Sequence, residues 1–327
     1  MKRLFFAAAA TLLMSVSVMA QTEAIRIVED GGTGPFKAAV AKDDSLPLYT
    51  IYRPADLKAA VEKYGKLPVV VFGNGGCYSA TNVTSERLYG EMASHGYIVI
   101  GLGNYSAKGI TPELDENDNF ENFVKMIGDE LGFENISNED FAKIMGHSEP
   151  SQLTDAINWA QRQTVKPGSE YYHMIDADKV AVMGSSCGGL QAISISFDTR
   201  IKTVIMKNSG TFPGDNQMSR DFISKDELKE VKVPVMYVVG NETDIAYPNA
   251  ADDFERINHI PVAFCSYNKV GHNGSDRDPH GGEMATVIVN WLDYYIKGIE
   301  SGKATFTDVN YQKKNFPEWQ MKSKNIR

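Results

Sequence analysis

The chain has 327 residues, of which 43% are hydrophobic and 23% charged, and it carries 33 Lys and Arg against 42 Asp and Glu. This length and composition indicate a globular protein with one large domain or two small ones. The net charge of −9 argues against nucleic acid or an anionic membrane as a partner, because both repel an acidic surface. The three cysteines are too few for a disulfide scaffold.

Residues 1–20 have the pattern of a secretory signal peptide. Two basic residues precede an apolar run over residues 4–14, and small residues at 18–20 offer a cleavage site. The run is short for a membrane span and no cysteine follows it that could carry a lipid, so we expect no membrane anchor; an uncleaved anchor is the alternative. The expected product is secreted or periplasmic, begins at Gln21 and folds as a single domain over residues 21–327.

Short apolar runs bounded by Gly and Pro predict the strands of a buried sheet. In chain order they lie at 36–40, 46–52, 67–72, 97–102, 180–183, 201–206, 233–239 and 262–267. Helices are expected at 84–95, 151–163 and 282–297, with Thr84 or Ser85 capping the first and Ser151 the second. This alternation predicts an α/β fold with a mostly parallel central sheet flanked by helices.

Residues 106–150 interrupt the alternation, because connections of this length are uncommon. They contain 11 Asp and Glu but 3 Lys and Arg, a net charge of −8. Apolar residues at helical spacing predict two short helices, over 120–131 and 141–145. Because the segment leaves the carboxyl end of a strand, where α/β proteins place their sites, we expect a helical cap that disfavours anionic substrates; a surface decoration is the alternative.

The most informative motif is Gly184-Ser185-Ser186-Cys187-Gly188, which fits the G-x-S-x-G pattern of a nucleophile elbow. A short apolar strand precedes it and a helix start follows it. The serine of such an elbow has strained backbone geometry, so its neighbours two positions away must lack side chains. Ser186 is therefore the candidate nucleophile.

A serine nucleophile needs a base, and the base needs an acid that holds its tautomer. Asp244 follows the strand at 233–239, and His272 follows the strand at 262–267 with glycines on both sides. This is the chain order Ser, Asp, His of the G-x-S-x-G enzymes. Glu242 is the alternative acid and His280 the alternative base.

An oxyanion hole needs two backbone N–H groups, one from the residue after the nucleophile and one from a loop after an earlier strand. Cys187 supplies the first. The Gly-rich turn after the strand at 67–72 supplies the second, with Asn74 and Gly75 as candidates. The turn is not a phosphate loop, since no Lys-Ser/Thr follows its glycines.

Cys187 has two further interpretations beside its backbone role. It could itself be a nucleophile, although it lies one position beyond the elbow serine, or it could form a disulfide with Cys77, which closes the Gly-rich turn. Three acidic residues after His272, namely Asp276, Asp278 and Glu283, are irregularly spaced and are expected to form a solvated loop rather than a metal site. We expect no cofactor and no metal.

Together these residues resemble the α/β-hydrolase superfamily, in particular the dienelactone-hydrolase-like branch with bacterial cutinases and polyester (PET) hydrolases. The likeness covers most of the chain, through residues 34–36, 92–100, 182–189, 234–248 and 271–272. The resemblance implies an α/β-hydrolase fold with Ser186 as nucleophile, Asp244 as acid and His272 as base. It implies that the backbone N–H groups of Asn74 and Cys187 bind the oxyanion.

The chain differs from that branch at four places. Ser185 and Cys187 flank the serine where the polyester hydrolases have an aromatic residue or His and a Met, and Asn74 replaces an aromatic residue. Residues 207–212 replace an aromatic clamp, and the acidic insertion replaces a short loop. The expected activity is hydrolysis of small or polymeric carboxylic esters through an acyl-enzyme. A serine peptidase or amidase, and a non-catalytic binding protein with this fold, are the alternatives.

Overall fold

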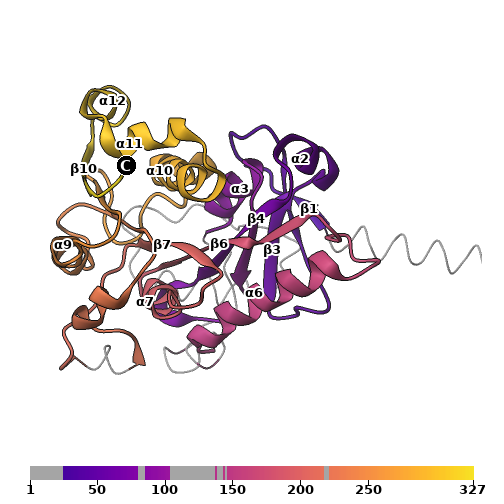
Figure 1. The fold of residues 1–327 in the computed structure, drawn as a ribbon, viewed down its shortest axis with the longest axis horizontal. Helices are drawn as coiled ribbons and strands as arrows, with labels where there is room; N and C mark the ends of the chain where they lie inside the picture. Colours follow the sequence, from indigo (N-terminus) through magenta and orange to yellow (C-terminus); the bar gives the residue numbers. More distant parts are fainter. Residues whose placement is uncertain (1–24, 80–84, 104–136, 138–142, 144–145, 217–220) are drawn as a thin grey trace, which may run out of the picture.

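The computed structural model describes residues 25–79, 85–103, 137, 143, 146–216 and 221–327 (Figure 1). Within them, the strands are β1 (Ile25–Ile27), β2 (Ala38–Ala41), β3 (Tyr49–Pro54), β4 (Leu67–Gly73), β5 (Ile98–Leu102), β6 (Ile175–Ser185), β7 (Ile201–Lys207), β8 (Val235–Val239), β9 (Val262–Tyr267) and β10 (Trp319–Lys324). They form one sheet in the order β1-β2-β3-β5-β4-β6-β7-β8-β9-β10. The prediction of an α/β protein with a mostly parallel sheet is confirmed.

The centre of the sheet, from β5 to β9, is parallel, and the antiparallel pairs lie at its two edges. Strands β4, β5, β8 and β9 are buried along their whole length, as their largely apolar sequences require. Val71, for example, pairs with Ile100 of β5 and Val182 of β6. Parallel pairing places the carboxyl ends of these strands along one edge, which positions the site described below.

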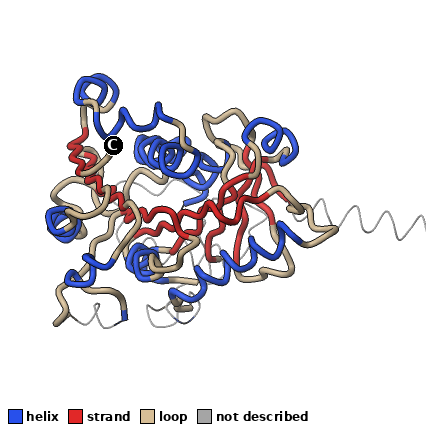
Figure 2. Tube along the Cα trace, viewed as in Figure 1, coloured by secondary structure: helices blue, strands red, loops and turns tan. Residues whose placement is uncertain are grey.

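Two layers of helices enclose the sheet (Figure 2). The core on one face includes side chains of α2 (Leu57–Tyr64), α6 (Pro150–Val165), α7 (Cys187–Ser194) and α9 (Tyr247–Arg256). The core on the other face includes side chains of α3 (Glu86–Ser94), α10 (Gly282–Leu292) and α11 (Ala304–Thr307). The remaining helical segments are α12 (Val309–Asn315), the 3-10 turns η1 (Gly75–Cys77), η3 (Lys225–Glu230), η4 (Pro279–Gly281) and η6 (Glu300–Lys303), and the π-helical η5 (Asp293–Lys297).

Three helix predictions need correction at their ends. Ser85 lies at the N-cap of α3, but its hydroxyl donates to the Asp276 carboxylate, 3.1 Å away, instead of capping the helix. The N-cap of α6 is Glu149 rather than Ser151, because Pro150 favours the first helical position and the Gln152 side chain accepts the Glu149 N–H at 2.8 Å. The last predicted helix changes from α-helical to π-helical geometry after Leu292.

The predicted signal peptide and most of the acidic insertion (106–136, 138–142 and 144–145) lie outside the described residues, so both remain predictions. The end of the insertion is described, and there Ser148 donates its N–H and its hydroxyl to the carbonyl of Cys77, at 2.7 and 2.9 Å. The chain therefore re-enters the described fold beside the Gly-rich turn. None of the helices in the described ranges is long and apolar enough to cross a membrane.

Candidate active site

The predicted site residues come together at the carboxyl edge of the parallel strands. Asn74 directly follows β4, and Ser186 follows β6. Asp244 lies in the turn after β8, and His272 lies in the turn after β9. Residues far apart in the sequence thus share one rim, which is where α/β sheets form their sites.

Ser186, His272 and Asp244 form a hydrogen-bonded triad. The Ser186 hydroxyl oxygen lies 3.0 Å from Nε2 of His272, and Nδ1 of His272 lies 2.6 Å from Oδ1 of Asp244. The side chain of Asp244 is fully buried and that of His272 is 29% exposed, so the buried end of the triad is the acid and the accessible end is the serine and imidazole. These are the contacts that a serine nucleophile, its base and the orienting acid require.

The backbone of Ser186 is strained, as the elbow motif predicts. Its φ of 52° and ψ of −120° lie in a region that side-chain-bearing residues rarely occupy. The neighbouring glycines are required by close packing, because a Cβ at Gly184 would lie 2.1 Å from the Gly188 carbonyl oxygen and a Cβ at Gly188 would lie 2.0 Å from that of Gly73. The backbones of β4, β6 and α7 therefore pack closely together, and this packing holds Ser186 at the tip of the turn.

The Asp244 carboxylate accepts four hydrogen bonds. Oδ1 accepts from His272 and from the N–H of Ala246 at 2.9 Å, and Oδ2 accepts from the Asn208 amide at 2.7 Å and the N–H of Gly240 at 3.0 Å. Burial alone would raise the pKa of Asp244, but these donors outweigh burial and lower the pKa to about 2. An ionised carboxylate can only accept, so the proton of neutral His272 lies on Nδ1 and Nε2 is free to act as a base.

The alternative base, His280, lies elsewhere. Its Nδ1 is 3.0 Å from Oδ1 of Asp30, and its backbone N–H donates to Oδ2 of the same carboxylate at 2.9 Å. These contacts with Asp30 fix the turn η4 and involve none of the triad.

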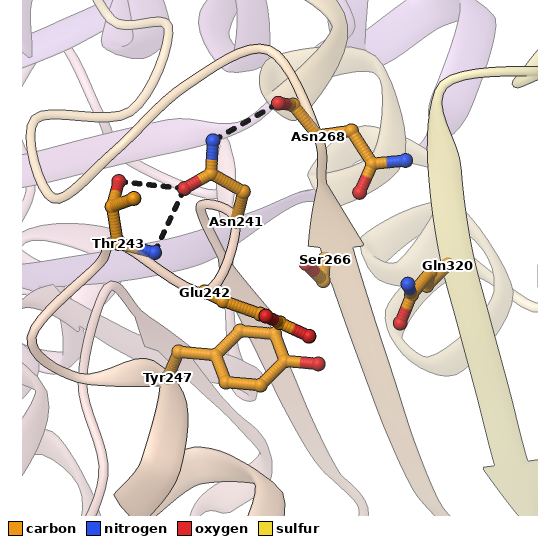
Figure 3. A pocket seen from close by; sticks show the side chains of 7 residues that line it. All are labelled: Asn241, Glu242, Thr243, Tyr247, Ser266, Asn268 and Gln320. Carbon is orange, nitrogen blue, oxygen red and sulfur yellow. Dashed lines mark hydrogen bonds between the residues drawn. The ribbon is translucent and has the colours of Figure 1, made fainter.

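The alternative acid, Glu242, is exposed on the turn after β8. It lines a polar pocket of about 320 Å³ together with Asn241, Thr243, Tyr247, Ser266, Asn268 and Gln320 (Figure 3). The pocket lies over the edge formed by β8, β9 and β10, and Asn241 bridges its rim by accepting from Thr243 and donating to the Asn268 carbonyl. Glu242 thus belongs to a surface depression, whereas Asp244 of the same turn contacts His272.

The Gly-rich turn after β4 lies against the serine. A Cβ at Gly75 would lie 3.9 Å from the Cβ of Ser186, so the Gly75 backbone closely approaches Ser186. The Asn74 side chain is engaged elsewhere, donating to the carbonyls of Leu102 at 2.8 Å and Tyr78 at 3.0 Å. Asn74 therefore fixes the turn to the end of β5. Cys187 is the first residue of α7, and an N–H at that position has no partner within its own helix.

A disulfide joins Cys77 to Cys187, with 5.2 Å between their Cα atoms and 110 positions between them in the sequence. This decides one of the interpretations that the sequence left open, and it excludes a free Cys187 thiol as the nucleophile. The bridge ties the Gly-rich turn to the residue that follows Ser186. Both candidate sources of oxyanion N–H groups are thus covalently linked.

Residues that the sequence did not single out complete the site. The segment 207–209, which leaves β7, contacts both ends of the triad through Lys207, Asn208 and Ser209. The expectation that Asp276 is solvated is wrong, because it is 7% exposed and its Oδ1 lies 3.0 Å from the Nζ of the buried Lys207. The available signal was the position of residues 207–209 at the carboxyl end of a predicted central strand.

The chain matches no protein-family model, and no curated protein sequence matches it significantly. Within the described residues, no three His, Cys, Asp or Glu side chains are grouped so that they could hold a metal ion.

Proposed function

We propose that this protein is a serine hydrolase that cleaves carboxylic esters through an acyl-enzyme intermediate. The observation that carries the proposal is the unbroken hydrogen-bonded line from the Ser186 hydroxyl through His272 to a saturated, ionised Asp244. This arrangement has a specific use, which is to remove the proton from a serine hydroxyl. The buried carboxylate accepts four hydrogen bonds and orients the imidazole, whose unprotonated nitrogen faces the serine. Maintaining Ser186 in strained geometry costs on the order of 1–3 kcal/mol, which also favours a functional role.

In the proposed reaction, Nε2 of His272 takes the proton of the Ser186 hydroxyl as its oxygen attacks the ester carbonyl carbon. The tetrahedral intermediate collapses when His272 returns this proton to the leaving alcohol oxygen, and the acyl group stays on Ser186. Water then loses a proton to Nε2 of His272 as its oxygen attacks the acyl carbon, which forms a second tetrahedral intermediate. This intermediate collapses when His272 gives that proton to the Ser186 oxygen, which releases the carboxylic acid and regenerates the serine hydroxyl. Asp244 remains ionised throughout and stabilises the imidazolium that forms twice.

The oxyanion of each tetrahedral intermediate is assigned to backbone N–H groups of Cys187 and of the Gly-rich turn. The approach of Gly75 to Ser186 favours Gly75 as the second donor, with the adjacent Asn74 as the alternative. The disulfide between Cys77 and Cys187 supports this assignment, since it fixes the distance between the two loops. Loss of one such donor typically lowers turnover about 100- to 1000-fold.

The α/β-hydrolase fold and the dienelactone-hydrolase-like branch are part of the same proposal. They are supported by the placement of Ser186, Asp244 and His272 after β6, β8 and β9, in the chain order of that superfamily. The disulfide supports an oxidising compartment, in agreement with the export expected from residues 1–20. The proposed substrates are small or polymeric neutral esters, and no cofactor enters the reaction.

The decisive experiment is labelling with a fluorophosphonate, which reacts with activated serines. The unmodified protein should label on Ser186, and Ser186→Ala should abolish both labelling and hydrolysis of nitrophenyl esters. Ser185→Ala is the matched control, because it removes the neighbouring hydroxyl of the same turn and should label normally. Labelling that persists in Ser186→Ala, or no labelling of the unmodified protein, would reject the proposal, and the latter would favour a binding protein.

A peptidase or amidase would use the same triad. The two activities are separated by comparing nitrophenyl esters with peptide nitroanilides of the same acyl group. We expect hydrolysis of the esters and negligible hydrolysis of the anilides. Comparable rates on both would assign an amidase.

A further inference from the structure

We propose that the segment 207–209 positions the catalytic triad, with Asn208 as the central positioning residue and the buried Lys207–Asp276 ion pair as its support. The inference rests on the proposed function. It concerns residues outside the triad that bond to the nucleophile, to the acid and to both ends of the histidine-bearing turn, residues 271–276.

The segment holds the backbone of the nucleophile from both sides. The carbonyl oxygen of Lys207 accepts the N–H of Ser186 at 2.9 Å. The hydroxyl of Ser209 donates to the carbonyl oxygen of Ser186 at 2.7 Å. Two bonds from one short segment therefore maintain the strained backbone of the serine.

Asn208 connects the acid to the histidine turn. Its amide group donates to Oδ2 of Asp244 at 2.7 Å and to the carbonyl oxygen of Gly271 at 3.3 Å. Gly271 directly precedes His272, so one side chain fixes both the carboxylate that accepts the hydrogen bond of the imidazole and the backbone that carries the imidazole. The amide oxygen of Asn208 in turn accepts from Nζ of Lys207 at 3.0 Å, which fixes which end of the amide faces Asp244.

Lys207 secures the far end of the same turn. Its Nζ, on a side chain only 1% exposed, lies 3.0 Å from Oδ1 of Asp276, and Oδ2 of Asp276 accepts from the hydroxyl of Ser85. A buried ion pair is weak evidence for stability, because desolvation offsets most of the attraction. It does fix geometry, and this one joins β7 to the end of the histidine turn.

The packing leaves no room for these groups to rearrange. Gly274 has a φ of 68°, and a Cβ there would lie 2.9 Å from Nζ of Lys207 and 3.0 Å from Oδ1 of Asn208. Asn208 itself has a φ of 44°, a left-handed conformation that favours Asn and Gly over other residues. The histidine turn therefore lies directly on the Lys207 and Asn208 side chains.

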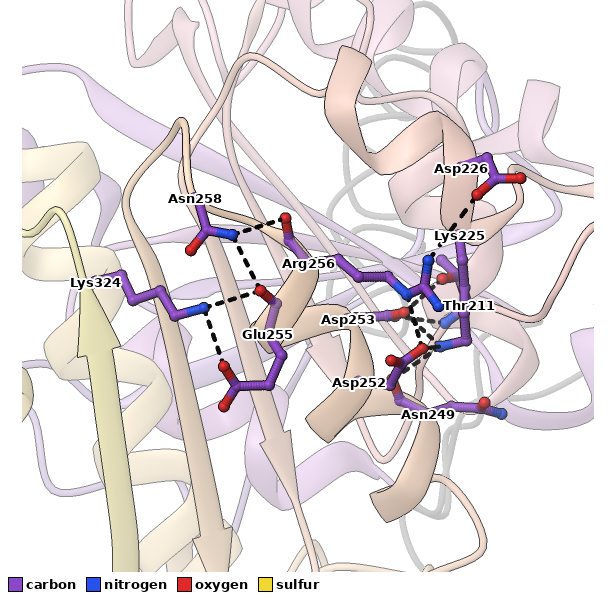
Figure 4. A network of polar contacts seen from close by, with 10 residues as sticks. All are labelled: Thr211, Lys225, Asp226, Asn249, Asp252, Asp253, Glu255, Arg256, Asn258 and Lys324. Atoms are coloured by element: carbon purple, nitrogen blue, oxygen red, sulfur yellow. Dashed lines mark hydrogen bonds and ion pairs between the residues drawn. The ribbon is translucent and has the colours of Figure 1, made fainter.

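A network of polar contacts attaches the residues that follow the segment, 210–211, to α9 (Figure 4). Asp253, which is fully buried, accepts from the N–H and the hydroxyl of Thr211, both at 2.7 Å, and from Lys225 at 2.7 Å. A Cβ at Gly210 would lie 2.5 Å from the backbone nitrogen of Ala250, so the segment and the helix are in close contact. The positioning segment is thus anchored at both ends, by β7 before it and by α9 after it.

The test is Asn208→Gly, which removes the amide and keeps the left-handed backbone without strain. Loss of a hydrogen bond to a charged group predicts a kcat about 10- to 100-fold lower, with KM unchanged within about twofold. The matched control is Asn325→Gly, because Asn325 also has a positive φ, 60°, and its amide donates to backbone carbonyls far from the triad. This variant should retain the full kcat.

A second measurement follows the His272 Nδ1 proton in the bond to Asp244 by its low-field proton NMR resonance. Asn208→Gly should shift or broaden this resonance, whereas Asn325→Gly should leave it in place. The double variant Lys207→Met with Asp276→Asn removes both charges of the buried pair together, keeps an acceptor for Ser85, and should also lower kcat and perturb the resonance.

The outcomes separate the two proposals. An active protein whose kcat and resonance are unchanged by Asn208→Gly would overturn the positioning role and leave the hydrolase proposal intact. A protein without Ser186-dependent turnover, in which Asn208→Gly still shifts the resonance, would overturn the hydrolase proposal while supporting the role of Asn208 in holding Asp244 and His272.

Discussion

Removing the disulfide between Cys77 and Cys187 gives the most quantitative test of how this site is held together. The variant is Cys77→Ala with Cys187→Ala, which deletes the bridge and retains every backbone N–H group. In the chain-entropy model, a crosslink that closes a loop of 110 positions lowers the entropy of the unfolded chain enough to stabilise the fold by about 4.8 kcal/mol at 25 °C. Measured values for native disulfides fall at about 2–5 kcal/mol, so the double variant should lose an amount in that range.

The assay is equilibrium unfolding in urea, followed by tryptophan fluorescence. With a slope of about 3 kcal/mol per molar urea for a chain of this size, a loss of 4.8 kcal/mol lowers the midpoint by about 1.6 M. The control is Cys265→Ala, because Cys265 is as buried as Cys77 and is unpaired, so it reports the cost of losing a buried sulfur without a crosslink. A double variant whose midpoint falls no further than that of Cys265→Ala would refute the loop-closure reasoning.

The same variant separates stability from alignment. The kcat of the double variant is measured at urea concentrations below its unfolding transition. Any decrease relative to the unmodified protein reports how far the bridge aligns the Gly-rich turn with the start of α7. We expect a reduction of about 10-fold, less than the 100-fold or more that follows loss of a whole oxyanion donor. An unchanged kcat would show that the two loops are aligned by packing alone.

Three further predictions follow from the described contacts. Asp244→Asn should lower kcat about 10⁴-fold, because the neutral amide no longer selects the reactive histidine tautomer. The pKa of Asp244 is lowered from 3.8 to about 2 in the folded state, so its ionised form contributes stability on the order of 2 kcal/mol. This contribution is complete above pH 4 and is lost as the pH falls through 2. The free energy of unfolding, measured over this pH range, should show the loss in the unmodified protein and a smaller loss in Asp244→Asn. Gly188→Ala should destabilise the fold by at least about 2 kcal/mol and lower the melting temperature, since its Cβ would meet the Gly73 carbonyl oxygen at 2.0 Å. Gly214→Ala is the control, because the nearest atom to its Cβ would be 4.0 Å away, and its melting temperature should barely change. Asp253→Asn should lower the free energy of unfolding by about 2 kcal/mol, because the buried lysine beside it loses a charged partner; an unchanged urea midpoint would contradict this.

Much of the fold was readable from local patterns. Apolar runs bounded by Gly and Pro predicted the central strands within a few residues, because a strand buried on both faces must be apolar along its length. The elbow motif was also readable locally, because Gly184, Ser186 and Gly188 lie within five positions and a side chain at Gly184 would meet Gly188. The contact that excludes a side chain at Gly188 is with the distant Gly73. The candidate acid and base followed from their places just beyond predicted strands.

The remaining structure depends on contacts between distant parts of the chain. Ser85 was expected to cap a helix, but Asp276 competes for its hydroxyl, and the sequence gives no sign that the two meet. Asp276 was in turn expected to be solvated, because an acidic residue in a Gly-rich loop normally is. Its burial depends on Lys207, which is itself buried at the end of β7.

By itself, the sequence determined the α/β class, the central strands of the sheet and the identity of the candidate nucleophile, since each follows from residue types within a short window. The edge strands β1 and β10 were not predicted. Only the tertiary structure decided that Cys77 pairs with Cys187, that Asp244 rather than Glu242 faces His272, and that Asn208 holds the acid in place. The physical reason is that parallel strands bring the ends of distant segments to one edge, and which side chains bond there depends on distances and burial that no single segment contains.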